Sequence, residues 1–122
     1  MSHPVRILPA VRGDIEDALT LTLRKFGERK YNGYRDLIRA AIERIAANPD
    51  DPRARRRPEI HAKARTFHIG RRNQRARHFF LYRVADDGVV ELARFLYDGM
   101  DLAQQLPPGY EAGPREEGGQ SR

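Results

Sequence analysis

Hydrophobic positions in the first half of the chain repeat with a helical spacing. One apolar stripe runs through residues 10–26 and a second through residues 28–47. Gly27 separates the two stripes as a helix-ending glycine, and Pro49 follows the end of the second. The pattern therefore predicts two helices joined as an αα-hairpin, preceded by a short strand over residues 5–8. The stripe positions are Val11, Ile15, Ala18, Leu19 and Phe26, then Tyr34, Leu37, Ile38, Ala41, Ile42 and Ile45.

Beyond residue 64 the period of the pattern changes from a helical one to two. Alternating or apolar runs over residues 65–69, 78–84 and 89–97 predict three strands, and Asp86-Asp87-Gly88 predicts a hairpin turn between the last two. The preceding stretch, NPDDPRARRRPEIHAK, has three prolines and no periodicity, so a surface loop is expected there.

The order of these elements predicts an α+β domain over residues 1–106. An N-terminal strand and a two-helix hairpin would precede a three-stranded antiparallel meander, with both helices on one face of the sheet. A short C-terminal helix is expected from Met100 to Leu106. Residues 107–122 contain four glycines and little to bury, which predicts a flexible tail.

Composition excludes several classes of protein. The 122 residues contain no cysteine, which excludes disulfides and thiolate metal sites and fits a reducing compartment. No apolar run approaches the roughly 18 residues of a membrane span, and the N-terminus lacks the apolar core of a signal peptide. We therefore expect a cytoplasmic protein without a membrane partner.

Charge is distributed unevenly along the chain. Residues 53–83 carry eleven Lys and Arg against one acidic residue, Glu59, whereas residues 84–122 carry three against eight. A basic block of this kind attracts polyanions, either nucleic acid or an acidic protein segment. The alternative is that these arginines only solvate a loop.

The usual catalytic and cofactor motifs are missing from the sequence. The only two serines, Ser2 and Ser121, lie at the termini, and no glycine-rich phosphate loop occurs. The histidines His61, His68 and His78 do not have the spacing of metal ligands. We expect neither a metal nor a cofactor.

Arginines within predicted strands are the main candidates for a site. Arg65, Arg83 and Arg94 could line a shallow anion-binding surface on the sheet, because bidentate guanidinium contacts suit phosphate. The structural alternative for Arg94, which interrupts an apolar run, is an ion pair with Asp98 or Asp101 that holds the following turn.

General acids or bases for RNA cleavage could also come from the strands or their ends. The residues with suitable side chains are His61, His78, Tyr82 and Tyr97. Their positions favour an ordinary core or strand-pairing role over a catalytic one.

Several stretches together resemble the RelE/ParE superfamily of type II toxin–antitoxin toxins. They are R-x-F-x-I-G at 65–70, F-L-Y-R-V at 80–84 and D-G-V-V-E-L-A-R-F-L-Y-D-G-M-D at 87–101. The front half agrees through Leu8, Ala10, Asp14 and Ile15 at the helix entry and A-x-N-P at 46–49. The resemblance covers roughly residues 5–106. It is greatest to the ParE branch, often named plasmid stabilisation proteins, which typically reads R-x-L-H-x-x-R-D where this chain reads R-F-L-Y-D-G-M-D.

The resemblance implies a bacterial growth-inhibiting toxin that is neutralised by a cognate acidic antitoxin. ParE-type toxins inhibit DNA gyrase and are not hydrolases. RelE-type toxins instead cut mRNA on the ribosome without a metal, which here would use Arg65, Arg94 and Tyr97. The third alternative is an inactive relic that only binds its antitoxin. We expect partner contacts from Arg65, Arg83, Arg94 and Asp101.

Departures from the family pattern bear on the choice between these activities. Tyr97 stands where the ParE branch usually has His, and Met100 stands where it has a second Arg. The RelE branch commonly places a Tyr or His near the end of its core, where this chain reads Ala103-Gln-Gln-Leu106. The missing terminal Tyr or His argues against nuclease activity.

Overall fold

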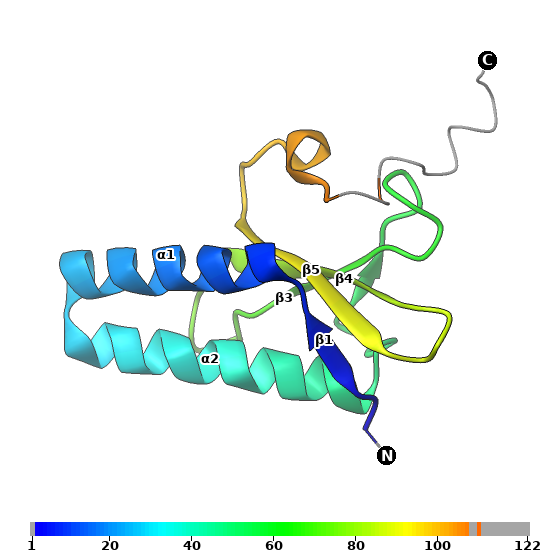
Figure 1. Cartoon of the computed structure of the whole chain (residues 1–122). Helices are drawn as coiled ribbons and strands as arrows, with labels where there is room; N and C mark the ends of the chain where they lie inside the picture. The colour runs from blue at the N-terminus through cyan, green and yellow to red at the C-terminus, as the bar shows by residue number, and fades with distance from the viewer. Residues whose placement is uncertain (1, 108–109, 111–122) are drawn as a thin grey trace.

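A computed structural model describes residues 2–107 and residue 110 of the chain (Figure 1). Strand β1 (Val5–Ile7) leads into helix α1 (Pro9–Phe26), which is followed by helix α2 (Glu28–Ala47). The remaining strands are β2 (Arg55–Arg56), β3 (Arg65–His68), β4 (His78–Val84) and β5 (Val90–Tyr97). A single 3₁₀ turn, η1 (Leu102–Gln105), comes after the last strand.

The strands form one sheet in the order β1-β5-β4-β3-β2. Strands β3, β4 and β5 pair antiparallel as the predicted meander, and β1 pairs parallel to β5. The sheet therefore has five strands, whereas the sequence predicted a three-stranded meander and one N-terminal strand. The additional strand is β2, an exposed two-residue edge within the segment predicted to be a loop. Its backbone pairing needs no hydrophobic pattern, so periodicity could not reveal it.

Both helices pack on one face of the sheet, and the main core lies between these two layers. Pro9 occupies the first position of α1, and Gly27, with φ of 87°, makes the turn between the helices. Figure 1 shows α1 and α2 side by side. Helix residues such as Val11, Leu37 and Ile45 meet sheet residues such as Phe80 and Leu92 in this core.

A second, smaller core covers the opposite face of the sheet. It consists of Ile60, Ala64, Leu81, Ala93 and Tyr110, with Leu8, Leu102 and Leu106 packed against them. The expected C-terminal helix over Met100 to Leu106 is instead the four-residue 3₁₀ turn η1, which supplies part of this cover. Of the tail predicted to be flexible, residues 108–109 and 111–122 lie outside the described part, and Tyr110 is fully buried.

A β-bulge interrupts the pairing of β4 with β5. Tyr82 pairs with Leu92 and Leu81 pairs with Arg94, which leaves Ala93 as the extra residue. Paired residues share a face of the sheet, so Leu92 faces the helices together with Tyr82 while Arg94 lies on the opposite face with Leu81. The sequence pattern had placed Arg94 on the same face as Val90 and Leu92, and the bulge is the reason that this was wrong.

Candidate functional site

Arg94 is held by a bidentate ion pair with Asp14 of α1. Its Nε donates to Asp14 Oδ2 at 2.8 Å and its Nη2 donates to Oδ1 at 2.9 Å. Its Nη1 also donates to the carbonyl oxygen of Gln105 at 3.0 Å. The hydrogen bonds and charge of Asp14 raise the pKa of the Arg94 guanidinium above its usual value. The carboxylate that binds this guanidinium thus comes from Asp14, whereas the sequence had suggested Asp98 or Asp101.

Asp14 also completes the edge of the sheet. Strand β1 pairs with β5 only as far as Leu92, and beyond that point α1 runs alongside β5. There the backbone N–H of Phe95 donates to Asp14 Oδ2 at 2.9 Å. Asp14 therefore satisfies a strand N–H that would otherwise lack its sheet partner. Both side chains of the pair are largely covered, with exposed fractions of 20% for Arg94 and 15% for Asp14.

Arg65 lies on β3, on the face of the sheet that the helices cover, next to the loop that follows α2. Its Nε donates to Asp50 Oδ1 at 2.9 Å, and the residue is buried. Its strand partner Tyr82 is buried as well and donates its hydroxyl to the carbonyl oxygen of Pro49 at 2.6 Å. Burial raises the pKa of the Tyr82 phenol, so this hydroxyl keeps its proton. Arg65 and Tyr82 together hold the loop after α2 against the sheet.

Arg83 lies on the face opposite the helices. Its Nε donates to Glu91 Oε1 at 3.0 Å across the β4–β5 pair, and its guanidinium carbon lies 4.7 Å from the centre of the Tyr110 ring. That distance is typical of a cation–π contact. Glu91 in turn contacts Arg6 of β1.

The structure does not bring these three arginines onto one surface. Arg65 is on the helix-facing side, whereas Arg83 and Arg94 are on the other side, and each guanidinium is bound by a carboxylate. Tyr97 lies at the far end of β5, half exposed, where it pairs with His78. The candidate ribonuclease residues Arg65, Arg94 and Tyr97 are therefore dispersed, and their proposed roles in binding or cleavage remain predictions.

His78 is the centre of an aromatic cluster at the end of the sheet. Its ring stacks on Phe95 with centroids 4.7 Å apart, and its Nδ1 lies 2.6 Å from the hydroxyl oxygen of Tyr34. Burial lowers the pKa of His78, which favours the neutral ring, and in one tautomer of that ring Nδ1 accepts a hydrogen bond from the Tyr34 hydroxyl. Nearby, His68 Nε2 lies 2.7 Å from Asp98 Oδ1.

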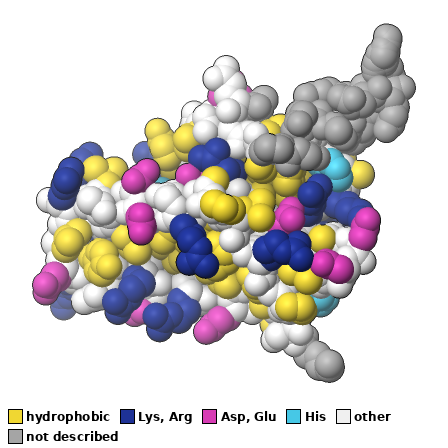
Figure 2. Space-filling model, in the orientation of Figure 1, with side chains coloured by type: hydrophobic (Ala, Val, Ile, Leu, Met, Phe, Trp, Pro, Cys, Tyr) yellow, Lys and Arg dark blue, Asp and Glu magenta, His cyan; other side chains and the backbone are white. Residues whose placement is uncertain are grey.

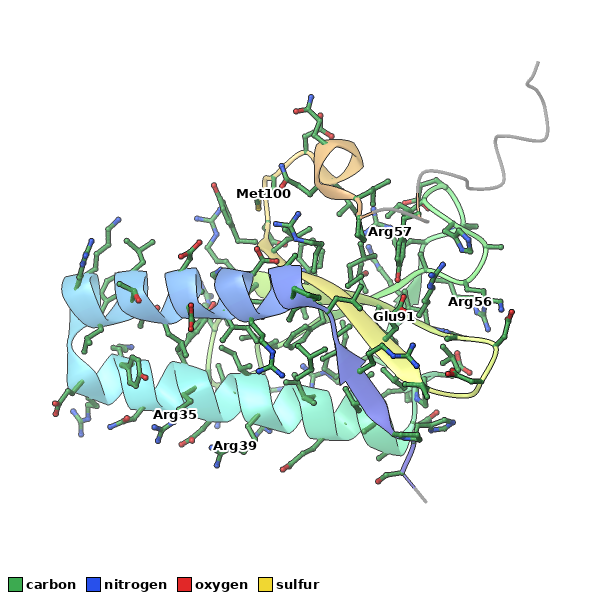
Figure 3. The ribbon with its side chains drawn as sticks, in the orientation of Figure 1. Arg35, Arg39, Arg56, Arg57, Glu91 and Met100 are labelled. Atoms are coloured by element: carbon green, nitrogen blue, oxygen red, sulfur yellow. The ribbon has the colours of Figure 1, made fainter. Side chains whose placement is uncertain are left out.

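An apolar groove of about 210 Å³ opens beside this cluster, between α1 and the end of β5. Leu21, Tyr97 and Met100 line it, with Asp14 and Asp17 at its edge. Figure 3 shows Met100 beside the end of β5. Leu21 and Phe26 on α1 are 53% and 65% exposed. In Figure 2, hydrophobic side chains are visible on the helical hairpin among interspersed positive and negative ones.

The basic block predicted from the sequence has two structurally different parts. In the first part, and at Arg83, most of the cations are bound to carboxylates within the chain: Arg56 and Arg65 to Asp50, Arg57 to Glu59, Lys63 to Asp86, and Arg83 to Glu91. Arg53 instead donates to the carbonyl oxygens of His68 and Gly70. In the second part, residues 71–77, none of the four arginines forms an ion pair with another described residue. Sequence could show the surplus of charge but not which arginines are paired.

Neither a metal site nor a membrane span is found among the described residues. No group of three or more His, Cys, Asp or Glu side chains there has an arrangement that could hold a metal ion. No helix in the part described is long and apolar enough to cross a membrane.

Comparison with known proteins identifies the relatives of this chain. Residues 5–102 match the family described as the ParE toxin of type II toxin–antitoxin systems, parDE. The chain is also 29% identical over 106 residues to Toxin ParE1 of Mycobacterium tuberculosis, in strain CDC 1551 / Oshkosh and in strain ATCC 25618 / H37Rv. That alignment covers 87% of this chain and 100% of the mycobacterial toxin. The family match over residues 5–102 includes both helices and all five strands.

Proposed function

The chain belongs to the ParE toxins of type II toxin–antitoxin systems, and from that premise we propose that it arrests growth by inhibiting DNA gyrase. It would act in the cytoplasm, without a cofactor, as a binding protein and not as a hydrolase. A cognate acidic antitoxin, encoded in the neighbouring reading frame, would neutralise it.

The observation that carries this proposal is the dispersal of the candidate catalytic residues. A metal-independent ribonuclease needs its phosphate-binding and acid–base groups around one scissile bond. Here Arg94 is bound by Asp14, and Arg65 is buried against Asp50 on another strand. Tyr97 lies at the end of the same strand as Arg94 but on the opposite face of the sheet. An inhibitor that acts by binding needs no such convergence, and the exposed hydrophobic residues of α1 offer a surface for a protein partner.

The direct test is a supercoiling assay with purified chain and purified gyrase on relaxed plasmid. Inhibition that increases with toxin and is relieved by stoichiometric antitoxin is the expected result. Undiminished supercoiling at every ratio of toxin to gyrase would rule out the proposed target. In that case, harmless expression of the chain without its antitoxin would identify it as an inactive relic.

The Tyr97→Phe variant distinguishes a ribonuclease from a gyrase inhibitor. Phenylalanine keeps the exposed ring but removes the hydroxyl that a catalytic tyrosine would use. We expect Tyr97→Phe to remain as toxic as the native chain. Primer extension on translated mRNA after induction provides the second readout, and new 5′ ends that disappear in this variant would establish the ribonuclease instead.

A further inference from the structure

Unpaired positive charge is concentrated where the turn between β3 and β4 meets the first turns of α2. The cations are Arg29 and Lys30 on α2 and Arg71, Arg72, Arg75 and Arg77 on the turn, all of them exposed. The carboxylates on the same turns of the helix are Glu28 and Asp36, so the positive charges predominate. None of the six cations has an ion-pair partner among the described residues.

The turn that carries four of these cations is rigidly built. Arg71 and Gln74 exchange backbone hydrogen bonds of 2.8 and 3.1 Å. The backbone of Ala76 lies so close to Gly70 that a Cβ on Gly70 would be only 3.0 Å from its nitrogen. The Gln74 side chain donates to the carbonyl oxygen of Gly33 at 3.4 Å, which ties the turn to α2. The two groups of cations are therefore held together before any ligand binds.

Between the turn and the helix lies a pocket of about 430 Å³. It is lined by Arg29, Lys30, Gly33, Tyr34, Gln74 and Arg75. Its charged lining is thus entirely positive, and it contains no aliphatic side chain. Protein-binding surfaces usually have an apolar centre, whereas nucleic-acid interfaces are polar and positively charged. The chemistry of this pocket suits an anionic sugar-phosphate backbone better than a peptide.

We propose that this surface, the α2–turn basic pocket, binds the phosphodiester backbone of nucleic acid. Arg75 from the turn and Arg29 from α2 both line the pocket, and a guanidinium can contact two phosphate oxygens at once. No base-reading element is involved, so binding is independent of sequence and sensitive to salt. The toxin would thereby contact nucleic acid itself, in addition to its protein target.

The test is binding of a short fluorescein-labelled DNA duplex to the full chain, followed by polarisation between about 50 and 200 mM salt. The site variant is Arg29→Gln with Arg75→Gln, which removes the two arginines that line the pocket. The control variant is Arg35→Gln with Arg39→Gln, which removes the same charge from exposed positions that point away from the rest of the molecule (Figure 3). Thermal melting of each variant confirms that the fold is retained.

We expect the site variant to weaken binding about tenfold at the lowest salt and to make the logarithmic salt dependence shallower by about two. The control should change affinity far less. Equal losses in both variants would show that binding follows net charge alone and would overturn the site. An RNA duplex of the same sequence shows whether the pocket prefers a DNA or an RNA backbone. Binding to either duplex supports the proposal.

Two further outcomes would refute the inference. The first is that the native chain binds neither duplex at the lowest salt. The second is that poly-L-glutamate displaces the DNA more effectively than unlabelled duplex does. The second result would assign the pocket to an acidic protein segment. Because no gyrase is present in this assay, its outcome is independent of the supercoiling test.

Discussion

Arg94 connects three parts of the molecule through a single guanidinium. It lies on β5, binds Asp14 on α1 and donates to the Gln105 carbonyl oxygen in η1. An arginine in an apolar strand is thereby stabilised by structure alone, without a ligand. The partly buried pair explains why a charge is tolerated at this position, because its hydrogen bonds compensate the loss of water.

Replacing Asp14 with Asn is expected to lower the free energy of unfolding by about 2–3 kcal/mol. The variant leaves Arg94 partly buried without a counter-charge and weakens the acceptor for the Phe95 N–H. Urea denaturation measures the change. Asp17→Asn is the matched control, because Asp17 lies on the same helix and is exposed. Equal stability of the two variants would show that the Arg94 pair contributes nothing.

At the scale of elements, the helices and the long strands could be predicted because their apolar periodicity is clear. The bulge at Ala93 could not be predicted, because an extra residue in a strand leaves no signal in the composition. The bulge places Arg94 on the face of the sheet opposite to the predicted one. The Asp14–Arg94 contact was also missed because it spans 80 residues. The only sequence signal for this contact was Asp14 itself, a carboxylate near the start of a helix that follows an edge strand.

The tight turn between β4 and β5 gives a prediction at the same scale. Gly88 has φ of 84°, in the left-handed region, and a Cβ there would meet nothing within 4 Å. Gly88→Ala should therefore destabilise the protein by about 1–2 kcal/mol through backbone conformation alone. Gly13→Ala, in open space on α1, should instead stabilise it by about 0.5–1 kcal/mol. Thermal melting should show a lower melting temperature for Gly88→Ala and a higher one for Gly13→Ala.

At the scale of the whole molecule, the sheet is covered on its two faces by unequal layers. Two long helices cover one face, while a loop, η1 and Tyr110 cover the other. Tyr110 is fully buried, yet its hydroxyl finds no hydrogen-bond partner within the described part of the chain. Burial of the Tyr110 ring therefore stabilises the fold, whereas the unpaired hydroxyl lowers its stability.

Substitutions at Tyr110 should separate these two contributions. Tyr110→Ala is expected to cost about 3 kcal/mol of stability by uncovering the smaller core. Tyr110→Phe should be neutral or stabilising, because it removes a buried unpaired hydroxyl. Tyr82→Phe provides the contrast, since that hydroxyl donates to Pro49 and its loss should cost about 1 kcal/mol. Chemical denaturation of the three variants would contradict this view if both phenylalanine variants lost equal stability.

The parallel pairing of β1 with β5 also determines when the protein can fold during synthesis. Val5 pairs with Val90, and Asp14 binds Arg94, so the first strand and helix depend on the last strand to be made. Contacts this distant in sequence form late and slow the folding of a small domain. A nascent chain that stops before β5 can form the helical hairpin but not the complete five-stranded sheet. The ribosome must therefore release nearly the whole domain before a folded toxin can exist.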